Sequence, residues 1–238
     1  MPHPTSMLFA ALDAGHSLKR IGGGSETDVY CSNNGRYAIK VKAEMGQQVA
    51  EARTLARQMD HAAAEFQACL GPQYTIPNTF LLAHDSQGLV HVVSLQPLFK
   101  EALPLAQLDY PSLSPAERHA VAHQLRAIMR LTLQFYYATG AMPDLYGRVT
   151  KSKADRQSRK GIAQLPCRLW GFLVTRSLLR SNNLLLTPAP ESRIFLVDYD
   201  PVFRSWLYRF VYYLVRWLLF WRDQALILWM QCGGPIPT

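Results

Sequence analysis

Three consecutive glycines that are followed by a lysine can form a phosphate-binding site. Both lie in the stretch from Ile21 to Lys42, IGGGSETDVYCSNNGRYAIKVK, in which the lysine is Lys40. Glycines let backbone N–H groups approach phosphate oxygens, and an ammonium group offsets the negative charge of the phosphates. A glycine-rich turn between two strands is the plain alternative. The choice depends on whether the rest of the chain supplies partners for Lys40.

Residues nearer the C-terminus are candidates for such partners. Asn183 lies in the motif SNNLLL, and Asp198 ends an apolar run in FLVDYD. Oxygen ligands held at a fixed spacing are what Mg²⁺ between phosphates requires. Because an apolar strand that ends in Asp-aromatic-Asp is uncommon by chance, this pattern favours a functional site over a plain turn. Asp144 precedes both residues, in TGAMPDLYG, after a long helical pattern.

The order of these motifs resembles that of the protein-kinase-like fold, especially its small bacterial phosphotransferase branch, from about Leu18 to Pro201. As G-x-G-S-x-x-x-V-Y, the first stretch is similar to the glycine-rich loop of protein kinases, although Thr27 stands in place of the third glycine. YAIKV is similar to the strand that carries the phosphate-binding lysine. VDYD resembles the variant of the aminoglycoside- and choline-kinase branch, because Asp200 stands in place of a glycine.

The resemblance implies that ATP binds beneath the glycine-rich loop and that Lys40 holds its α- and β-phosphates. A glutamate on the following helix would position this lysine. We prefer Glu65, which stands twelve residues before Pro77, where the next strand begins. Glu51, close behind the lysine, stays open, as does a plain surface role for both glutamates. The nucleotide-binding residues that the resemblance implies are Gly22, Gly23, Gly24, Ser25, Thr27, Val29, Lys40, Gln96 and Leu98.

The resemblance also implies that Asn183 and Asp198 bind Mg²⁺ and that Asp144 orients the accepting hydroxyl. Two departures from the family pattern concern Asp144. Met142 stands where the family has histidine. Asp144 also lies thirty-nine residues before Asn183, instead of about five. Either the basic segment between them loops out, or another residue is the base.

Strand and helix patterns must position these residues. DVYCS and RYAIKVK flank the turn NNG, and TFLLAH and LVHVVSLQP form a second strand pair, with a helical pattern between the pairs that ends at Gly71. A second helix is expected from Ser114, its cap, to about Ala138, and a short strand pair across TPAPES. We expect an α+β, bilobal, protein-kinase-like fold: a five-stranded antiparallel N-terminal lobe, residues 1–97, and a reduced, mainly helical C-terminal lobe, residues 98–238.

The composition is that of a folded cytoplasmic protein. Hydrophobic residues make up 49% of the 238 residues and charged residues 18%, values typical of globular chains. The four cysteines lie far apart without a C-x-x-C pair, which argues against a zinc site or a disulfide framework and fits a reducing cytosol. The first residues, MPHPTSMLFAALDAG, lack the basic and apolar regions of a signal peptide.

One segment makes the protein basic. Residues 148–180 hold nine Lys and Arg and one acid, whereas the rest of the chain is balanced, so the overall charge is +8. The basic insertion, residues 148–181, is either a solvated loop or a surface that attracts anionic lipid, a phosphorylated substrate or nucleic acid. Because it has no aromatic residue from Arg148 to Gly161, nucleic acid is the least expected of these partners.

The chain ends in an aromatic helical pattern, residues 205–230. Arg209, Arg216 and Asp223 recur every seven residues, which gives a helix that is apolar on most sides with one narrow polar stripe. It is either a buried helix that closes the second lobe or an interfacial helix on the inner face of a membrane, where Arg, Trp and Tyr side chains suit the headgroup boundary. Spanning is not expected, because Arg216 near the bilayer centre would cost ~2.5 kcal/mol or more.

Together these features predict an ATP- and Mg²⁺-dependent phosphotransferase, or kinase, that transfers the γ-phosphate to a hydroxyl of an unidentified acceptor. The alternative is a pseudokinase-type nucleotide-binding or regulatory protein with little or no catalysis. The displaced Asp144, the missing histidine and the short C-terminal lobe favour that alternative.

Overall fold

The computed structural model of the chain describes residues 8–9, 18–23, 27–42, 48–84, 89–147, 176–199 and 206–233. These residues belong to two compact units. The first takes its described residues from 1–64 and 77–100, and the second from 65–76, 101–148 and 160–238. Of the residues predicted to matter, Gly24, Ser25, Asp200 and most of the basic insertion lie outside the described part of the chain.

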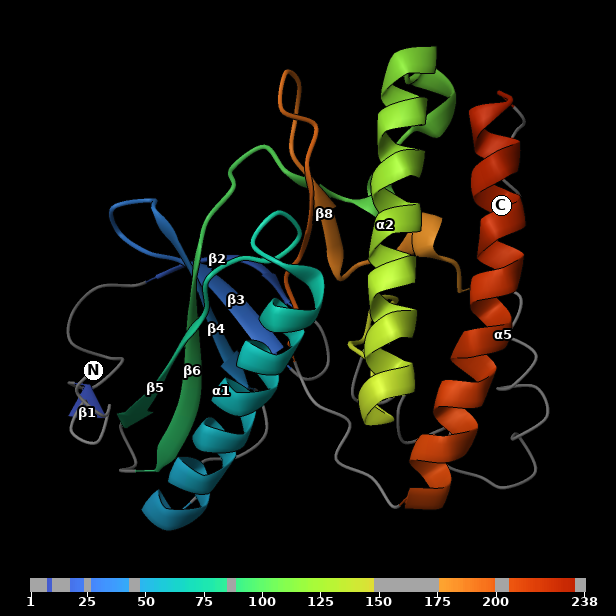
Figure 1. Ribbon diagram of the computed structural model, residues 1–238. Helices are drawn as coiled ribbons and strands as arrows, with labels where there is room; N and C mark the ends of the chain where they lie inside the picture. Colours follow the sequence, from blue (N-terminus) through green and yellow to red (C-terminus); the bar gives the residue numbers. More distant parts are fainter. Residues whose placement is uncertain are drawn as a thin grey trace, which may run out of the picture. The chain divides into compact units, whose positions relative to one another are not determined.

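The first unit is built on an antiparallel sheet with the strand order β5-β6-β4-β3-β2 (Figure 1). The strands are β2 (Lys19–Gly23), β3 (Thr27–Cys31), β4 (Tyr37–Lys42), β5 (Thr79–His84) and β6 (Val90–Pro97). The predicted five-stranded antiparallel sheet is therefore confirmed. A short strand that the sequence did not predict, β1 (Leu8–Phe9), extends the sheet by pairing parallel to β5.

The turn between β3 and β4 shows how local sequence sets the register of the sheet. Gly35 adopts a φ of +66°, which glycine tolerates without steric penalty. The side-chain oxygen of Asn34 accepts hydrogen bonds from the Ser32 hydroxyl (2.8 Å) and the Arg36 N–H (3.0 Å). Because the turn is held on both sides, it determines which residue of β3 faces Lys40.

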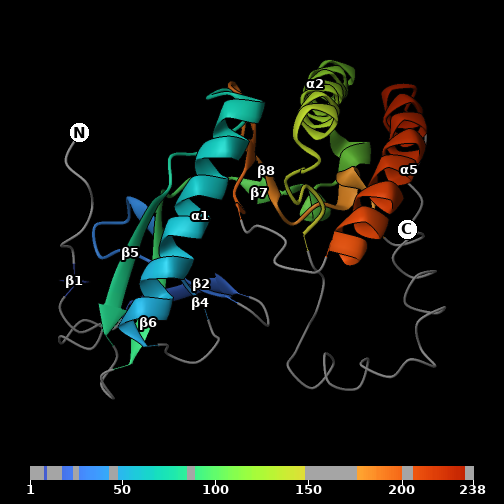
Figure 2. The same ribbon diagram turned by 60° about the horizontal axis from the view of Figure 1, so that its bottom comes forward.

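Helix α1, Val49–Leu70, packs against this sheet (Figure 2). Ala52 and Met59 of the helix are buried against Val90 and Val92 of β6, and four partly buried apolar side chains surround them: Leu55, Ala56, Phe80 and Leu82. The helix ends at the predicted glycine, Gly71, whose φ of +75° is a conformation that L-residues with a side chain rarely adopt.

Two long helices, α2 (Pro115–Thr139) and α5 (Trp206–Gln231), lie side by side in the second unit (Figures 1 and 2). The predicted capping box begins α2: the Ser114 hydroxyl accepts from the Glu117 N–H (3.3 Å), and the Glu117 carboxylate accepts from the Ser114 N–H (2.8 Å). Gly140 ends the helix with a φ of +70°. Both helices begin and end within a residue or two of the predicted positions.

A small antiparallel sheet, with the order β7-β8-β9, completes the second unit. β8 (Leu184–Leu186) and β9 (Ile194–Leu196) confirm the predicted strand pair. β7 (Leu103–Pro104) and the 3₁₀ turns at Leu105–Gln107, Tyr110–Ser112 and Leu178–Arg180 were not predicted. Gln124 of α2 holds the β8–β9 hairpin, because its side chain bonds the Ser192 carbonyl (2.7 Å) and the Ile194 N–H (2.9 Å).

Helix α5 has two different faces. One is buried in the unit and consists of Tyr213, Arg216, Leu219, Phe220, Asp223, Ile227 and Met230. Arg216 and Asp223, two members of the predicted polar stripe, therefore point inward. This buried face fits the alternative of a helix that closes the second lobe, and membrane attachment stays a prediction. A helix that is apolar on most sides can turn several faces inward, so only packing decides its orientation.

No helix in the described part of the chain is long and apolar enough to cross a membrane.

Candidate functional site

The sheet of the first unit places three predicted nucleotide-binding residues in one row. Gly22 of β2 lies opposite Val29 of β3, and Val29 lies opposite Lys40 of β4. Residues directly opposite each other on neighbouring antiparallel strands share a face of the sheet. The register of β2 shifts between Arg20 and Gly22, an irregularity that glycine suits. The row thus combines a glycine, an apolar side chain and an ammonium group, which are the groups needed to cover and neutralise a phosphate.

The same face carries a second row. Ala38 of β4 pairs with Gln96 of β6, two positions along from Lys40, and alternate residues of a strand point to the same side. Gln96 is buried. Leu98 follows β6, and its N–H donates to the Arg36 carbonyl (2.8 Å). Gln96 and Leu98 therefore belong to the same sheet as Lys40, at its β6 side.

Helix α1 packs against the face that carries Lys40. Ser94 of β6 lies opposite both Lys40 and Phe80, and Phe80 contacts the buried cluster of α1. A carboxylate partner for Lys40 is expected from this helix. Glu51 and Glu65 are both exposed on α1 and belong to different units. The preference for Glu65 stays a prediction.

In the second unit, Asp144 lies in the loop that follows α2. Its Oδ1 accepts hydrogen bonds from the N–H groups of Tyr146 (3.0 Å) and Gly147 (3.1 Å) and from Arg216 Nη2 of α5 (2.5 Å). An aspartate that bonds the backbone two and three residues ahead stabilises a turn. Arg216 Nη1 also donates to the Pro143 carbonyl (2.9 Å), so the guanidinium holds the loop at two points. The carboxylate therefore has a fixed position.

Asn183 contacts this loop, although thirty-nine residues separate it from Asp144. Its Nδ2 donates to the Asp144 carbonyl (2.8 Å). Ser181 adds two links, because its hydroxyl donates to the Leu145 carbonyl (2.5 Å) and accepts from the Asn183 N–H (3.1 Å). Two motifs that lie far apart in the sequence are therefore in contact.

Gly147 fits this junction for two reasons. Its φ is +70°, which favours glycine. A Cβ at this position would lie 2.6 Å from Asn183 Oδ1 and 3.3 Å from the Cβ of Asn182. Sequence reasoning did not single out this glycine; the available signal was its place three residues after Asp144.

Asp198 follows the hairpin that begins after Asn183. The Val197 N–H donates to the Asn183 carbonyl (2.9 Å). Asp198, the next residue, therefore lies at the same end of the β8–β9 pair as Asn183. Across the described ranges, no group of three or more His, Cys, Asp or Glu residues is arranged to hold a metal ion. An amide oxygen and a carboxylate nevertheless suit Mg²⁺ when phosphate oxygens and water supply the other ligands.

A buried network of charged residues supports the aspartate loop from α5. Arg216 is 0% exposed, and its guanidinium lies 5.5 Å from the centre of the Tyr146 ring. Asp223 Oδ2 accepts from the Tyr146 hydroxyl (2.8 Å) and from the Leu178 N–H (3.1 Å). Its Oδ1 pairs with Arg222 (2.9 Å). Asp144 thus pairs with Arg216 and Asp223 with Arg222, so each of these carboxylates has a positively charged partner.

The two aspartates of the network have pKa values shifted in opposite directions. Burial disfavours ionisation of Asp144, but the charge and hydrogen bond of Arg216 and the Gly147 N–H outweigh burial and lower the pKa of this carboxyl. Burial dominates at Asp223 and raises its pKa, although Arg222 acts in the opposite direction. Asp144 is therefore ionised at neutral pH and accepts hydrogen bonds, but it is a weak base.

Sequence reasoning missed Arg216, Tyr146 and Asp223 as parts of this arrangement. The signal for Arg216 and Asp223 is two charges seven residues apart on an otherwise apolar helix. That spacing predicts a shared helix face. It does not predict which loop the face meets.

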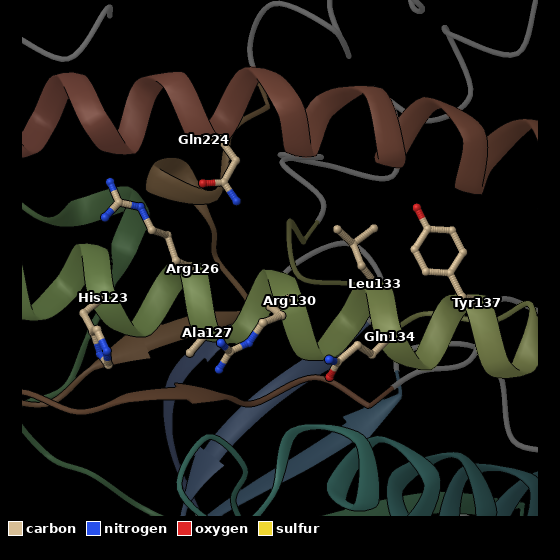
Figure 3. Close-up of a pocket in the computed structure, with 8 residues that line it drawn as sticks. All are labelled: His123, Arg126, Ala127, Arg130, Leu133, Gln134, Tyr137 and Gln224. Carbon is tan, nitrogen blue, oxygen red and sulfur yellow. The ribbon is translucent and has the colours of Figure 1, made fainter.

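A wide cavity of about 560 Å³ lies beside α2 and is not the predicted site (Figure 3). In Figure 3, Leu133 and Tyr137 point from α2 toward α5, and His123 points away from it. None of the residues predicted to bind nucleotide or metal lines the cavity. Its lining consists of His123, Arg126, Ala127, Arg130, Leu133, Gln134, Tyr137 and, from α5, Gln224.

Comparison with known proteins finds distant likeness among solved structures. No family model and no curated protein matches the chain. Among solved structures, the chain is similar to a MAP kinase from Leishmania major, with 12% identity and a TM-score of 0.40. The match covers 78% of this chain and 46% of that one, so the chain spans less than half of the kinase it matches.

Proposed function

We propose that the protein is an ATP- and Mg²⁺-dependent phosphotransferase that transfers the γ-phosphate to a hydroxyl group. The observation that carries the proposal is the 2.8 Å hydrogen bond from Asn183 Nδ2 to the Asp144 carbonyl. It joins two motifs that were nominated separately, one for metal binding and one for orienting the hydroxyl. The row formed by Gly22, Val29 and Lys40 is the second support.

Each residue has a distinct role in the proposed mechanism. Lys40, positioned by a glutamate of α1, holds the α- and β-phosphates under the glycine-rich loop. Asn183 and Asp198 provide oxygen ligands for Mg²⁺, which would neutralise charge on the phosphates. Asp144 accepts a hydrogen bond from the acceptor hydroxyl and orients it toward the phosphate. This role requires an ordered carboxylate more than a strong base.

The VDYD motif supports a relation to the aminoglycoside- and choline-kinase branch of bacterial phosphotransferases. The chemical class of the acceptor is an alcohol, carried by a protein side chain, a sugar, a lipid or a small molecule.

A kinase-fold protein that binds nucleotide with little catalysis is the second candidate. The observation that favours it is the pairing of Asp144 with Arg216, whose side chain is 1% exposed. An aspartate held in this way stabilises the loop whether or not a hydroxyl reaches it. Met142, at the position where the family has histidine, is buried and apolar.

Nucleotide binding is the first test. Mg-ATP at about one hundred times its Kd stabilises a protein by about 2.7 kcal/mol, which raises the Tm of a chain of this size by roughly 5–10 °C. We expect this shift in the wild type and its loss in Lys40→Ala and Asp198→Ala. Lys100→Ala and Asp60→Ala, which remove exposed charges of the same kind, are the matched controls. No shift in the wild type would overturn the nucleotide site itself.

Turnover then separates the two candidates. The enzyme proposal predicts ATP hydrolysis or phosphorylation of an acceptor from a panel of alcohols, with loss of activity in Asp144→Asn under conditions in which the thermal shift with Mg-ATP persists. A wild-type protein that binds Mg-ATP but transfers no phosphate to any acceptor, to itself or to water supports the second candidate instead.

The metal assignment has its own test. Asp198→Ala is expected to weaken Mg²⁺-dependent ATP binding more than Asn183→Ala, because a carboxylate neutralises the ion and an amide does not. Calorimetric titration of Mg-ATP into both variants measures the difference. Equal affinities would contradict the assignment of Asp198 as the charged ligand.

A further inference from the structure

The cavity of about 560 Å³ beside α2, which we call the α2 cavity, is lined by basic and apolar side chains (Figure 3). Arg126, Arg130 and Tyr137 contribute from one side of the helix, because steps of four and seven residues return to the same side. The volume falls within the range of about 300–1,000 Å³ that is typical of small-molecule sites. All of the lining residues belong to the second unit, so this unit forms the cavity by itself.

Arg126 and Arg130 give the α2 cavity two positive charges one helical turn apart, a spacing at which like charges repel each other. From Arg118 to Thr139, α2 carries no acidic residue. The only acid of α5 is Asp223, which is buried and paired with Arg222. Within the described ranges, neither arginine of the cavity forms an ion pair. The positive charge of the cavity is therefore not neutralised by the described part of the chain.

Helix α1 shows how the same chain arranges arginines on a solvated helix. Arg53 and Arg57 are exposed and have the same spacing of four residues, but α1 also carries Glu51, Asp60 and Glu65. Acidic and basic residues thus occur together along α1, where charges of both signs offset one another. The cavity face of α2 lacks this balance, which favours binding of an anion there.

Both ends of the α2 cavity are held by hydrogen bonds to α5. At one end, Arg126 Nη2 donates to Gln231 Oε1; a guanidinium has five N–H donors, so others remain for a ligand. At the other end, Trp217 Nε1 donates to the Tyr137 hydroxyl oxygen (3.0 Å), and the Tyr137 O–H keeps its own proton to donate. Gln224 points from α5 toward α2 between these two bonds (Figure 3). Side chains that are already ordered lose less entropy when a ligand binds.

We propose that the α2 cavity binds a small organic phosphate, a phosphate monoester whose ester group is apolar. Arg126 points toward α5 and Arg130 away from it (Figure 3), so the phosphate would lie between the two guanidinium groups. Its charge of about −1.5 to −2 matches theirs, and its oxygens suit the forked donors of arginine. Ala127, Leu133 and the ring of Tyr137 provide apolar surface for the ester group. The proposal is independent of the proposed phosphotransferase activity.

Titration calorimetry of the full chain with phenyl phosphate tests the proposal. For a ligand of about eleven non-hydrogen atoms, we expect a Kd in the millimolar range or tighter. Inorganic phosphate lacks the apolar group and phenol lacks the charge, so each should bind at least about tenfold more weakly. Raising NaCl from about 0.1 M to about 1 M should weaken the binding of phenyl phosphate, because salt screens the guanidinium charges.

A cavity variant carries Arg126→Gln and Arg130→Gln. We expect its affinity for phenyl phosphate to fall at least about tenfold, because charge-assisted hydrogen bonds are lost. The matched control, Arg53→Gln with Arg57→Gln, removes two exposed arginines of the same spacing from α1 and should bind like the wild type. Arg130→Gln alone changes an exposed side chain without touching the bonds between α2 and α5, and it should also weaken binding. Circular dichroism verifies that the variants keep their helices.

Chemical modification locates the bound phosphate. Phenylglyoxal reacts with exposed guanidinium groups, and mass spectrometry of the digested protein measures the reaction at each arginine. Phenyl phosphate should slow the reaction at Arg130 and leave the reaction at Arg53 unchanged. The Lys40→Ala variant should bind phenyl phosphate like the wild type, which separates this site from the proposed nucleotide site.

Four outcomes would overturn the proposal. The first is wild-type protein that binds phenyl phosphate no more tightly than inorganic phosphate or phenol. The second is a cavity variant that binds phenyl phosphate as tightly as the wild type. The third is loss of binding in Lys40→Ala, which would assign phenyl phosphate to the nucleotide site. The fourth is a glutamate hexapeptide that binds through Arg130 when phenyl phosphate does not, which would assign the cavity to an acidic protein segment.

Discussion

Replacing Arg216 by methionine tests whether the Asp144 loop depends on α5. The substitution keeps a long side chain that fills the space but removes the charge and both donors. In the folded protein, Arg216 contacts Asp144 Oδ1 at 2.5 Å and the Pro143 carbonyl at 2.9 Å. The Asp144 side chain is only 16% exposed, so its carboxylate would remain largely buried without a counter-ion.

The expected loss of stability follows from this burial. Breaking a buried ion pair by removing one partner destabilises a protein by about 3–5 kcal/mol. Without Arg216, the Asp144 carboxyl can bind a proton instead of staying charged. At pH 7 this protonation costs about 4 kcal/mol for a group with a pKa near 3.9. This cost of protonation is an upper limit for the penalty of burying the unpaired Asp144 carboxylate. We therefore expect Arg216→Met to lower the free energy of unfolding by about 3–4 kcal/mol at pH 7.

The loss should depend on pH in a defined direction. The pKa of Asp144 is lower in the folded wild type than in the unfolded chain. The carboxylate therefore contributes its full stability above the pKa of the unfolded state, and this contribution is lost as pH falls through the pKa of the folded state. In the variant, burial without Arg216 raises that pKa, and protonation relieves the penalty between pH 7 and pH 4. Near pH 4 the difference should shrink to about 1 kcal/mol, the value of the lost hydrogen bond to Pro143.

Urea unfolding followed by Trp fluorescence measures these values, because four of the five tryptophans lie on α5. Arg20→Met is the matched control: it removes an arginine from the exposed ion pair with Asp28 and should change stability by less than about 1 kcal/mol. A loss below 1 kcal/mol for Arg216→Met at pH 7, or a loss that does not change with pH, would refute the reasoning.

Two further variants probe the same loop by urea unfolding. Gly147→Ala should destabilise the protein by more than the roughly 1–2 kcal/mol of a left-handed backbone, because its Cβ would lie 2.6 Å from Asn183 Oδ1. Gly140→Ala has the same φ of +70° with nothing within 4 Å, so equal losses would contradict this account. Tyr146→Phe removes a donor from buried Asp223 and should cost about 1–3 kcal/mol; an unchanged stability would show that the hydroxyl is not needed there.

The helices and strands of this protein were predictable because their signals are local. Ser114 and Glu117 form the predicted capping box, and Gly71 ends the first helix where the sequence places it. Asn34 and Gly35 make the turn that pairs β3 with β4. In each case the physical cause acts within four residues. The same reason explains the misses: β1 and β7 are two-residue strands that carry no pattern of their own and form only by pairing with distant strands.

The candidate site depends on both kinds of information. The sequence by itself determined the residue types that favour phosphate and metal chemistry, such as Lys40 after the glycines and Asp198 after an apolar strand. Only the tertiary structure decided that Asp144 and Asn183 touch, and that Arg216 turns inward to hold their loop. Spacing along a chain does not report which distant groups meet, since a long insertion closes at little extra entropy. A helix that is apolar almost all round likewise shows its buried face only after it has packed.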